Sequence, residues 1–459
     1  MTSSSAMTGQ SADDTSFRAA LEARLYNRRT PSRTPGAVVR PTSEAEVVEA
    51  VRRARRDGLR IAVQSGGANW SSVSLREGGL LIDVGALDHV RIDTAARTAT
   101  VGPGVRSQDF AARLAAVSLA FPVGHCGVPA MGGYLLGGGL GLNWGHWQPA
   151  CFSVIAARVV TAAGELVEVD EHRNADLLWL LRGAGAGFPG IVTEFTVVLQ
   201  NRPRDTRVST WWFGLDRIDE VTRWVTAASA TLPSHVEVAV TTAGPTRDVL
   251  PPGDGVPEHL VSVAALAFVD DAEDALRSLA PLDHPPLPPL LHTDREAVPF
   301  ELLHHGAEVA HPAGHRVASD TFWSDHAVHE VLPPLADLLA RPPSGLNSVV
   351  VLMPGHGAPG TNQPLGVSAY SMDKRTLVLA FATWTDAADD TPNDTWLQEV
   401  VARLEPLACG HFLNEADTSK PDRHRRSFSP ENWARLRALT AAHDPDGVFH
   451  GFGHDHGPR

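Results

Sequence analysis

Three glycine-rich segments carry the clearest chemical signal in the sequence. The first, residues 64–71 (QSGGANWS), follows an expected strand, and paired glycines there let backbone N–H groups approach an anion. It is a candidate diphosphate cradle or a tight turn, and its spacing matches neither a dinucleotide fingerprint nor a P-loop. The second, residues 124–141, has too many glycines for a strong helix or strand. It predicts either backbone packed against a flat ligand or a structural loop. The third, residues 182–193 (RGAGAGFPGIVT), is a glycine bend entering a strand.

Composition limits the classes of protein to consider. The 459 residues are 43% apolar, which excludes disorder for the bulk of the chain and allows two domains. The formal net charge of −14 disfavours binding to nucleic acid. Three cysteines cannot form a disulfide framework, and 21 histidines contrast with only 3 tyrosines. An enzyme with this composition has many histidines available for proton transfer and few tyrosines.

No part of the sequence predicts export or insertion into a membrane. Residues 1–17 are polar, with neither an apolar core nor a cleavage site, so they are expected to form a frayed tail. No apolar run approaches the roughly 20 residues that a membrane-spanning helix needs. We therefore expect a soluble, cytoplasmic protein with no membrane partner. The scattered histidines have no convincing metal-ligand spacing, so no metal site is expected.

The elements that must position these segments alternate between helix and strand. Ser43 and Glu46 form a capping box that predicts a helix to Arg56, and Asn174 is expected to cap another helix. Further predicted helices and strands are 60–64, 80–84, 90–93, 98–101, 107–117, 156–169 as a hairpin, 176–181 and 191–199. Composition shifts near residue 203, where strands and helices alternate at longer spacing, and Ser429 opens a last helix.

The glycine segments, taken in this order and with the two hairpins between them, resemble a known family. The motifs that carry the resemblance are SGG-x-N-W, GLLIDV, ATVGPGV, FP-x-GHC, GGYLLGGGLG, LLWLLRGAG, GIVTEF and the closing SPENWARLRALTAAHDPDGVF. They are similar to the FAD-linked oxidases of the vanillyl-alcohol-oxidase and p-cresol-methylhydroxylase (PCMH) superfamily, and most of all to its berberine-bridge-enzyme-like branch. The resemblance covers roughly residues 37–202 and 410–452.

The resemblance implies an α+β fold. A two-subdomain PCMH-type FAD-binding domain would be joined to a substrate domain with a large antiparallel sheet covered by helices. The expected divisions are a tail and lead-in helix at 1–36, the FAD-binding domain at 37–202, the substrate domain at 203–409, and a segment at 410–459 that returns to the FAD-binding domain.

The resemblance also assigns cofactor-binding residues. Residues 65–71 would cradle the FAD diphosphate, the glycines of the second segment would line the flavin, and the strand after the third would contact the cofactor through its backbone. The expected cofactor-binding residues are Ser65, Gly66, Gly67, Ala68, Asn69, Ser71, Cys126, Val128, Gly132, Gly133, Gly137, Val192 and Asn414.

Two departures from the family pattern bear on the mechanism. The family commonly carries a flavin-linking histidine where this chain has Ala68, so a covalent link to FAD is expected through Cys126 alone. The alternative for Cys126 is a small buried residue. The branch often uses a tyrosine as the base where this chain has Phe412, which cannot accept a proton, whereas Asn414 matches.

A substitute base must therefore come from elsewhere. His125, Tyr370 and Asn414 are the expected catalytic residues, with His125 the best placed because it adjoins Cys126. Other candidates in the sequence are Tyr134, His146, His356, His411, Glu415 and Asp417. For any single histidine a surface or hydrogen-bonded role is the commoner one. The cluster at 144–147 (WGHW) is expected to form either an aromatic wall for a planar substrate or ordinary core.

The expected function is oxidation of a small organic molecule by FAD. Two electrons would leave an alcohol, an amine or an activated C–H group as hydride to flavin N5, and O2 would reoxidise the cofactor. The branch suggests a secondary metabolite or a carbohydrate as substrate, and a monomer or small homo-oligomer as the assembly. Two alternatives remain open: a flavin-dependent cyclase or oxygenating enzyme, and a degenerate, flavin-free binding protein.

Overall fold

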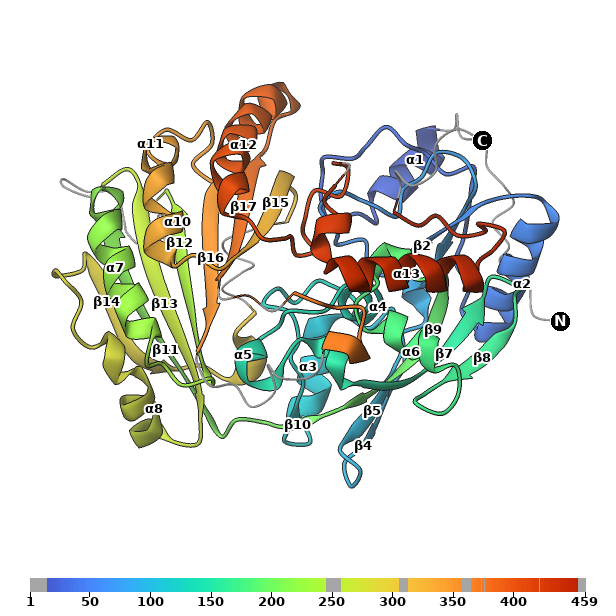
Figure 1. Ribbon diagram of the computed structural model, residues 1–459, viewed down its shortest axis with the longest axis horizontal. Coiled ribbons are helices and arrows are strands. Elements are labelled where there is room, and N and C mark those ends of the chain that lie inside the picture. Colours follow the sequence, from blue (N-terminus) through green and yellow to red (C-terminus); the bar gives the residue numbers. More distant parts are fainter. Residues whose placement is uncertain are drawn as a thin grey trace.

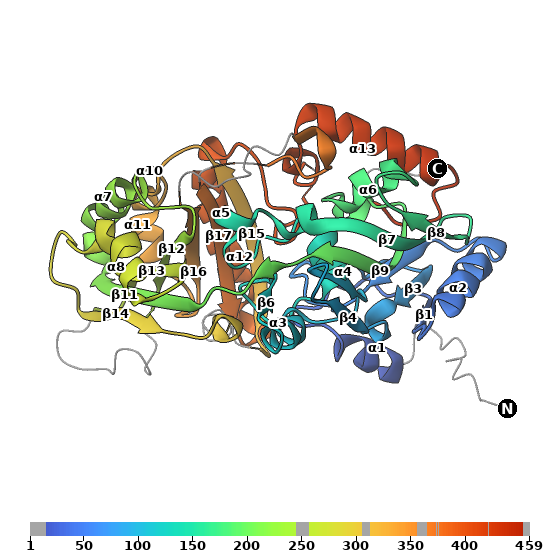
Figure 2. The ribbon, with the colours of Figure 1, turned by 90° about the horizontal axis from the view of Figure 1, so that it is seen from below.

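A computed structural model describes residues 15–244, 257–304, 313–355, 365–372, 374, 376–420 and 422–452 (Figure 1). Most of the expected polar tail and His356 therefore lie outside the described residues. The chain forms two bodies side by side, one built on small sheets near the N-terminus and one on a single large sheet (Figures 1 and 2).

The N-terminal body contains two principal sheets. A parallel sheet has the order β1–β3–β2, and an antiparallel sheet has the order β4–β5–β9–β7–β8. Their strands are β1 (Ala37–Val39), β2 (Ile61–Gln64), β3 (Leu80–Asp83), β4 (Val90–Asp93), β5 (Thr98–Val101), β7 (Val154–Thr161), β8 (Leu166–Val169) and β9 (Gly190–Val198). β6 (Leu119–Ala120) pairs with β10 (Gln200–Asn201). The predicted hairpins are confirmed as β4–β5 and β7–β8.

Of the two helix caps predicted for this body, one is confirmed and one is wrong. The helices of this body are α1 (Thr15–Glu22), α2 (Glu44–Arg56), α3 (Ser107–Ala115), α4 (Met131–Leu136), α5 (Trp144–Trp147) and α6 (Ala175–Leu181). The Ser43 side chain caps α2, as predicted. Asn174 precedes α6, but its φ of 54° turns the side chain away, and it donates to the Glu168 carbonyl instead of capping the helix.

The second body is built on a seven-stranded antiparallel sheet with the order β14–β11–β13–β12–β16–β17–β15. The strands are β11 (Asp205–Gly214), β12 (Val236–Ala243), β13 (Leu260–Val269), β14 (Leu291–Ala297), β15 (Arg316–Ser324), β16 (Ser348–Pro354) and β17 (Thr376–Trp384). Helices α7 (Ile218–Ser229), α8 (Ala272–Leu279), α10 (Val328–Val331), α11 (Ala336–Leu339) and α12 (Asp390–Leu404) cover one face (Figure 1). The predicted α+β fold with a large, helix-covered antiparallel sheet is confirmed.

Strand alternation gives this sheet two different faces. On β12, Val236, Val238 and Val240 point into the core beneath the helices, because successive side chains on a strand face opposite ways. The intervening residues of β12 therefore point toward the N-terminal body. The opposite face of the sheet is thus free to line a site between the two bodies.

The last part of the chain returns to the N-terminal body. Helix α13 (Pro430–His443) is capped by Ser429, as predicted, and lies across that body (Figure 1). The tail beyond it adds a parallel bridge between Phe449 and Ile61 of β2. On the way, Gly410 forms an antiparallel bridge with Trp323 of β15, so residues 410–417 run along the edge of the large sheet.

The second glycine segment contains more helix than its composition predicts. α4 forms within the segment, and α5 follows shortly after it. Gly132 lies inside α4, where a Cβ would come within 3.0 Å of the Ser65 hydroxyl oxygen. Close packing against the first glycine segment therefore outweighs the poor helix propensity of glycine.

Candidate functional site

A cavity of about 720 Å³ lies between the two bodies. Its walls come from both bodies and from the C-terminal segment. They comprise the loop after β2, the second and third glycine segments, strands β12, β16 and β17, and residues 412–419 and 449–452. A volume of this size suits a cofactor or a drug-sized ligand. Its two ends differ in the groups that they offer.

One end is built by the backbone of the loop after β2. The N–H groups of residues 66–69 donate to no acceptor within the described part of the chain. Gly67 has a φ of 66°, and its carbonyl accepts from the Tyr26 N–H at 3.0 Å, which anchors the loop. Unpaired N–H groups in such a turn form an anion-binding concavity. This end of the cavity fits a diphosphate.

Two arginines add positive charge to the same end. Arg33 donates to the carbonyl oxygens of Leu75 and Ser71, and Arg76 donates to the Gly451 carbonyl. Neither guanidinium forms an ion pair with a described carboxylate. Burial and the nearby Arg33 and Arg60 lower the pKa of Arg76 to about 10. The pair remains cationic at neutral pH and suits an anionic ligand.

Most of the predicted cofactor-binding residues line this one cavity. Those that do are Ser65, Gly66, Gly67, Ala68, Asn69, Ser71, Cys126, Val128, Gly132, Gly133, Val192 and Asn414. Gly137 does not: it lies behind the wall, against the Asn414 side chain, where a Cβ would overlap the amide. Cys126 is partly exposed and forms no disulfide within the described residues. The structure thus brings the three glycine segments together, although they are far apart in the sequence.

Asn414 ties three walls of the cavity together. Its side-chain amide donates to the Tyr134 carbonyl of α4 at 3.1 Å, and its own carbonyl accepts from the Asn69 side chain at 3.0 Å. The residue therefore joins the C-terminal segment to the first and second glycine segments. These contacts make Asn414 a positioning residue for the loop that carries Phe412 and Glu415.

The other end of the cavity is built by side chains of the large sheet. Glu237, Ala239 and Thr241 of β12 line it, together with apolar residues of β16 and β17. Those apolar residues are Val350, Leu352, Leu379 and Phe381. From the C-terminal segment, Phe412 closes the same region, with its ring 6.5 Å from that of Trp323. This end is apolar except for Thr241 and a few titratable groups.

His125 and Glu237 form an ion pair across the two bodies. His125 Nε2 contacts Glu237 Oε1, and the Glu237 side chain is only 5% exposed. Burial lowers the pKa of His125, but Glu237, Glu415 and a backbone hydrogen bond with Leu140 outweigh it and hold that pKa above its usual value. Because these partners favour the imidazolium, His125 is better suited to holding Glu237 than to accepting a proton.

Glu415 is the third titratable group at this end. Burial raises the pKa of its carboxyl, while a hydrogen bond from the Trp70 side chain and the charge of His125 oppose the rise. A raised pKa makes a carboxylate a stronger general base than an ordinary exposed one. Glu415 lies in the C-terminal segment, three residues beyond Phe412.

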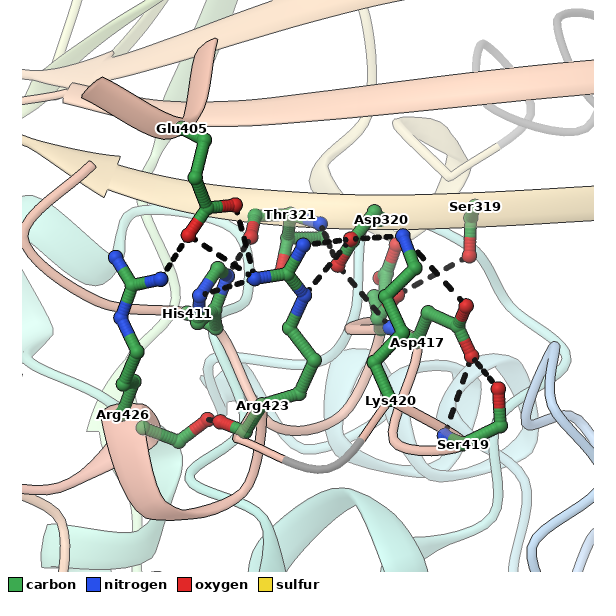
Figure 3. Close-up of polar contacts among 12 residues, drawn as sticks. Ser319, Asp320, Thr321, Glu405, His411, Asp417, Ser419, Lys420, Arg423 and Arg426 are labelled. Carbon is green, nitrogen blue, oxygen red and sulfur yellow. Dashed lines mark hydrogen bonds and ion pairs between the residues drawn. The ribbon is translucent and has the colours of Figure 1, made fainter. Parts of the chain in front are cut away.

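A buried ionic network holds that segment against β15 (Figure 3). Asp320, fully buried on β15, pairs with Lys420 at 3.0 Å and with Arg423 at 2.9 Å. Arg423 also contacts Glu405 and, at 3.0 Å, His411 Nε2. Burial and Arg423 lower the pKa of His411 to about 4, so His411 is neutral and serves this network rather than the cavity.

The other sequence candidates lie away from the cavity or serve its walls. Tyr370 is buried against Phe152 and the second and third glycine segments, outside the cavity lining. His146 bonds Ser234 at 2.8 Å, and Asp417 bonds Ser419. Trp144 packs on Trp323, and Trp147 packs on Phe268 and Phe300, so the 144–147 cluster is core and not a substrate wall.

Glu237, like Arg33 and Arg76, is a site residue that the sequence analysis did not identify. The only signal was one acidic residue among valines at the start of an expected strand (VEVAV). A carboxylate on an apolar strand is buried only with a partner or a function. Its partner, His125, is 112 residues away in the sequence, so only the fold brings the two together.

The described residues contain neither a metal cluster nor a membrane-spanning helix. No three side chains of His, Cys, Asp or Glu converge there in a way that could hold a metal ion. Within the same ranges no helix has the length and apolar character to cross a membrane.

Comparison with known proteins relates the chain to flavoproteins. Residues 35–170 match the family model described as "FAD binding domain". The FAD-linked oxidoreductase ptmO of Penicillium ochrochloron is 27% identical over 423 residues, covering 92% of this chain and 91% of that protein. (R)-6-hydroxynicotine oxidase of Paenarthrobacter nicotinovorans is 34% identical over 192 residues, covering 42% and 41%. The crystal structure of 6-hydroxy-D-nicotine oxidase from Arthrobacter nicotinovorans superposes with a TM-score of 0.83 at 23% identity, covering 98% of each chain.

Proposed function

This chain is an FAD-dependent oxidoreductase with relatives among the berberine-bridge-enzyme-like proteins, and from that premise we propose that it is an oxidase of small organic molecules. The substrate would be an alcohol, an amine or a compound with an activated C–H group. It gives up two electrons as hydride and one proton, and O2 takes the electrons from the cofactor. Relatives named as oxidases support this choice of acceptor.

One observation carries the proposal: a single cavity joins an anion-binding end to an apolar end that holds carboxylates. The free N–H groups of residues 66–69 and the two arginines fit the diphosphate of FAD. Gly132 and Gly133 leave the wall between the two ends without side chains, as a flat ring system requires. Bound there, FAD supplies the hydride acceptor, and the protein supplies orientation and charge.

We propose that Glu415 is the general base that accepts the substrate proton. It lines the cavity, and burial raises the pKa of its carboxyl, which strengthens it as a general base. The Trp70 hydrogen bond orients the carboxyl, and the apolar walls keep water from competing for the substrate proton. Phe412, which the resemblance places where the family often has a tyrosine, lines the same cavity and would exclude water there.

Reduction of the bound flavin in the absence of O2 tests the oxidase. The purified protein is mixed anaerobically with panels of alcohols and amines, and its absorbance near 450 nm is followed. Bleaching by a substrate, followed by return of the colour and consumption of O2 on admitting air, supports the proposal. Turnover to a cyclised or rearranged product without bleaching supports the cyclase instead. A colourless protein that takes up no FAD contradicts both.

We further propose that FAD is attached covalently through Cys126. The thiol lines the cavity and is partly exposed, whereas Ala68 offers no attachment on the opposite loop. A thioether replaces one ring hydrogen of the cofactor, and the two electrons and two protons that this releases leave with O2 as the oxidant. The bond prevents loss of the cofactor during turnover.

Acid precipitation tests the attachment. Yellow colour is expected to stay with the wild-type pellet and to leave with the supernatant of Cys126→Ala. The matched control is Cys409→Ala, because Cys409 is an exposed thiol outside the cavity lining, and its pellet is expected to stay yellow. Release of colour from the wild type would contradict a covalent link.

A further inference from the structure

The second carboxylate oxygen of Glu237 has no donor among the described residues. Oε1 is held by His125, but Oε2 is buried and accepts no hydrogen bond from them. The side chain is 95% buried as a whole, since only 5% of its surface is exposed, and the residue lines the cavity. A buried acceptor left without a donor destabilises the protein, and more so when it is charged. A donor on a bound ligand would remove that destabilisation.

The charges at this end of the cavity do not cancel. Glu237 and Glu415 are two carboxylates, and within the described lining His125 is the one cation that faces them. The other cations of that lining, Arg33 and Arg76, contact Ser71, Leu75 and Gly451 at the opposite end. When all three groups are ionised, this end of the cavity (the substrate end) carries one excess negative charge. Its apolar walls screen that charge poorly.

The remaining walls define the body of the ligand. Leu352, Leu379 and Phe381 project from neighbouring strands, and Trp70 and Phe412 close the sides. Their side chains are aliphatic or aromatic, and they offer a broad contact to a flat or bulky hydrocarbon group. A carbohydrate, with a hydroxyl on nearly every carbon, would leave most of its hydrogen bonds unmade against them.

We propose that the substrate is an amine that binds as a monocation, with its N–H donated to Glu237 Oε2 and its apolar body against β16 and β17. The inference rests on the oxidase proposed above and specifies its substrate class. A neutral alcohol could also donate to Oε2, but it would leave the excess negative charge uncompensated.

Oxidation of such an amine balances in atoms and electrons with Glu415 as the base, FAD as the oxidant and water. The bound ammonium gives one proton to Glu415 and becomes the neutral amine. The carbon beside nitrogen then loses a hydride to FAD, and the C–N bond becomes an iminium double bond. Water cleaves the iminium to a carbonyl compound and the ammonium form of the second fragment. Glu237, still paired with His125, holds the nitrogen throughout.

Matched pairs of probes test the inference on the FAD-loaded enzyme. We would use N-methylbenzylamine and benzyl methyl ether, and the naphthylmethyl and biphenylmethyl analogues of both. Binding is measured anaerobically from the change in flavin absorbance on mixing. At least one amine is expected to bind about 10- to 100-fold more tightly than its ether, the range typical of a hydrogen bond to a charged group.

Two variants and a control locate the preference. Glu237→Gln is expected to remove most of the preference for the amine over the ether, and Glu415→Gln is expected to weaken that preference. Glu296→Gln makes the same change in charge on exposed β14 of the same sheet and is expected to leave it unchanged. Thermal unfolding of each variant shows whether a loss of binding reflects a loss of fold.

The outcomes separate this inference from the oxidase proposal. An FAD-loaded enzyme that binds no amine, binds ethers equally well, or keeps its preference for amines in both cavity variants would contradict an amine substrate. The oxidase proposal would be unaffected. A protein that takes up no FAD overturns the oxidase itself, and with it this inference.

Discussion

The two ends of the cavity differ in what lines them: mainly backbone groups at one end and side chains at the other. The end that we propose for the cofactor (the cofactor end) consists mainly of backbone: a turn with a φ of 66° at Gly67, N–H groups without an acceptor among the described residues, and glycines that bring loops close together. The substrate end consists of side chains that project from strands β12, β16 and β17 and from residues 412–415. The first is supported by close packing between loops, and the second by buried ionic contacts such as that of Asp320 with Arg423.

The difference shows how a family can retain a cofactor while it changes its substrate. A backbone cradle tolerates few substitutions, because a Cβ at Gly67 would overlap the Arg24 carbonyl. A strand face keeps its geometry when a side chain is exchanged, because the ladder of backbone hydrogen bonds does not depend on it. We therefore expect changes at the proposed substrate end to alter recognition, and changes at the proposed cofactor end to weaken binding of FAD.

The largest effect is expected from breaking the network beneath the substrate end. Asp320→Ala leaves Lys420 and Arg423 without their buried partner, so the free energy of unfolding should fall by about 3–5 kcal/mol. The control is Asp325→Ala, because Asp325 pairs with Lys374 at the surface with 65% of its side chain exposed. That change should cost about 0–1 kcal/mol. Chemical denaturation measures both, and equal losses would contradict the role of the network.

A smaller effect is expected at the cofactor end. Gly67→Ala places a Cβ against the Arg24 carbonyl and should cost about 2–4 kcal/mol, with loss of bound FAD. Gly58 has nearly the same φ, 65°, but a Cβ added there would meet no atom within 4 Å, so Gly58→Ala should cost about 1 kcal/mol through backbone strain alone.

The readouts for this pair are the ratio of absorbance at 450 nm to that at 280 nm and the midpoint of thermal unfolding. A Gly67→Ala protein with full flavin content would show that the cradle does not depend on close packing at this glycine.

The smallest effect is a shift of the pH profile without a change in its plateau. Burial raises the pKa of Glu415, and the Trp70 hydrogen bond opposes that rise. Glu415 acts as a base only when it is ionised, so kcat/KM should fall as pH drops through this raised pKa. Trp70→Phe removes the opposing hydrogen bond and raises the pKa further, so the acid limb should move to higher pH.

The control for the pH profile is Trp147→Phe, because Trp147 packs on Phe268 and Phe300 outside the cavity lining. Its acid limb should coincide with that of the wild type. His125→Gln removes the other group that opposes the rise, so it should also move the limb to higher pH. A limb that moves to lower pH in Trp70→Phe would remove Glu415 as the base.

The sequence alone predicted the loop of the proposed cofactor end, though not Arg33 and Arg76, and much of the secondary structure. Glycine pairs, Ser caps and alternating strands are local signals, because each depends on the conformational limits of a few adjacent residues. They predicted α2, α13, both hairpins and the loop at 65–71. The predicted Asn174 cap is wrong because capping depends on the direction in which a side chain leaves the backbone, which residue type does not specify.

Only the tertiary structure decided the substrate end. Glu237 and His125 are 112 residues apart, and they meet because β12 faces the second glycine segment. Tyr370 is among the catalytic residues expected from the sequence, yet the fold buries it outside the cavity lining. Which titratable groups share a low-dielectric space, and so shift one another's pKa, depends on the packing of distant segments. That packing is a property of the folded chain and not of any short stretch of its sequence.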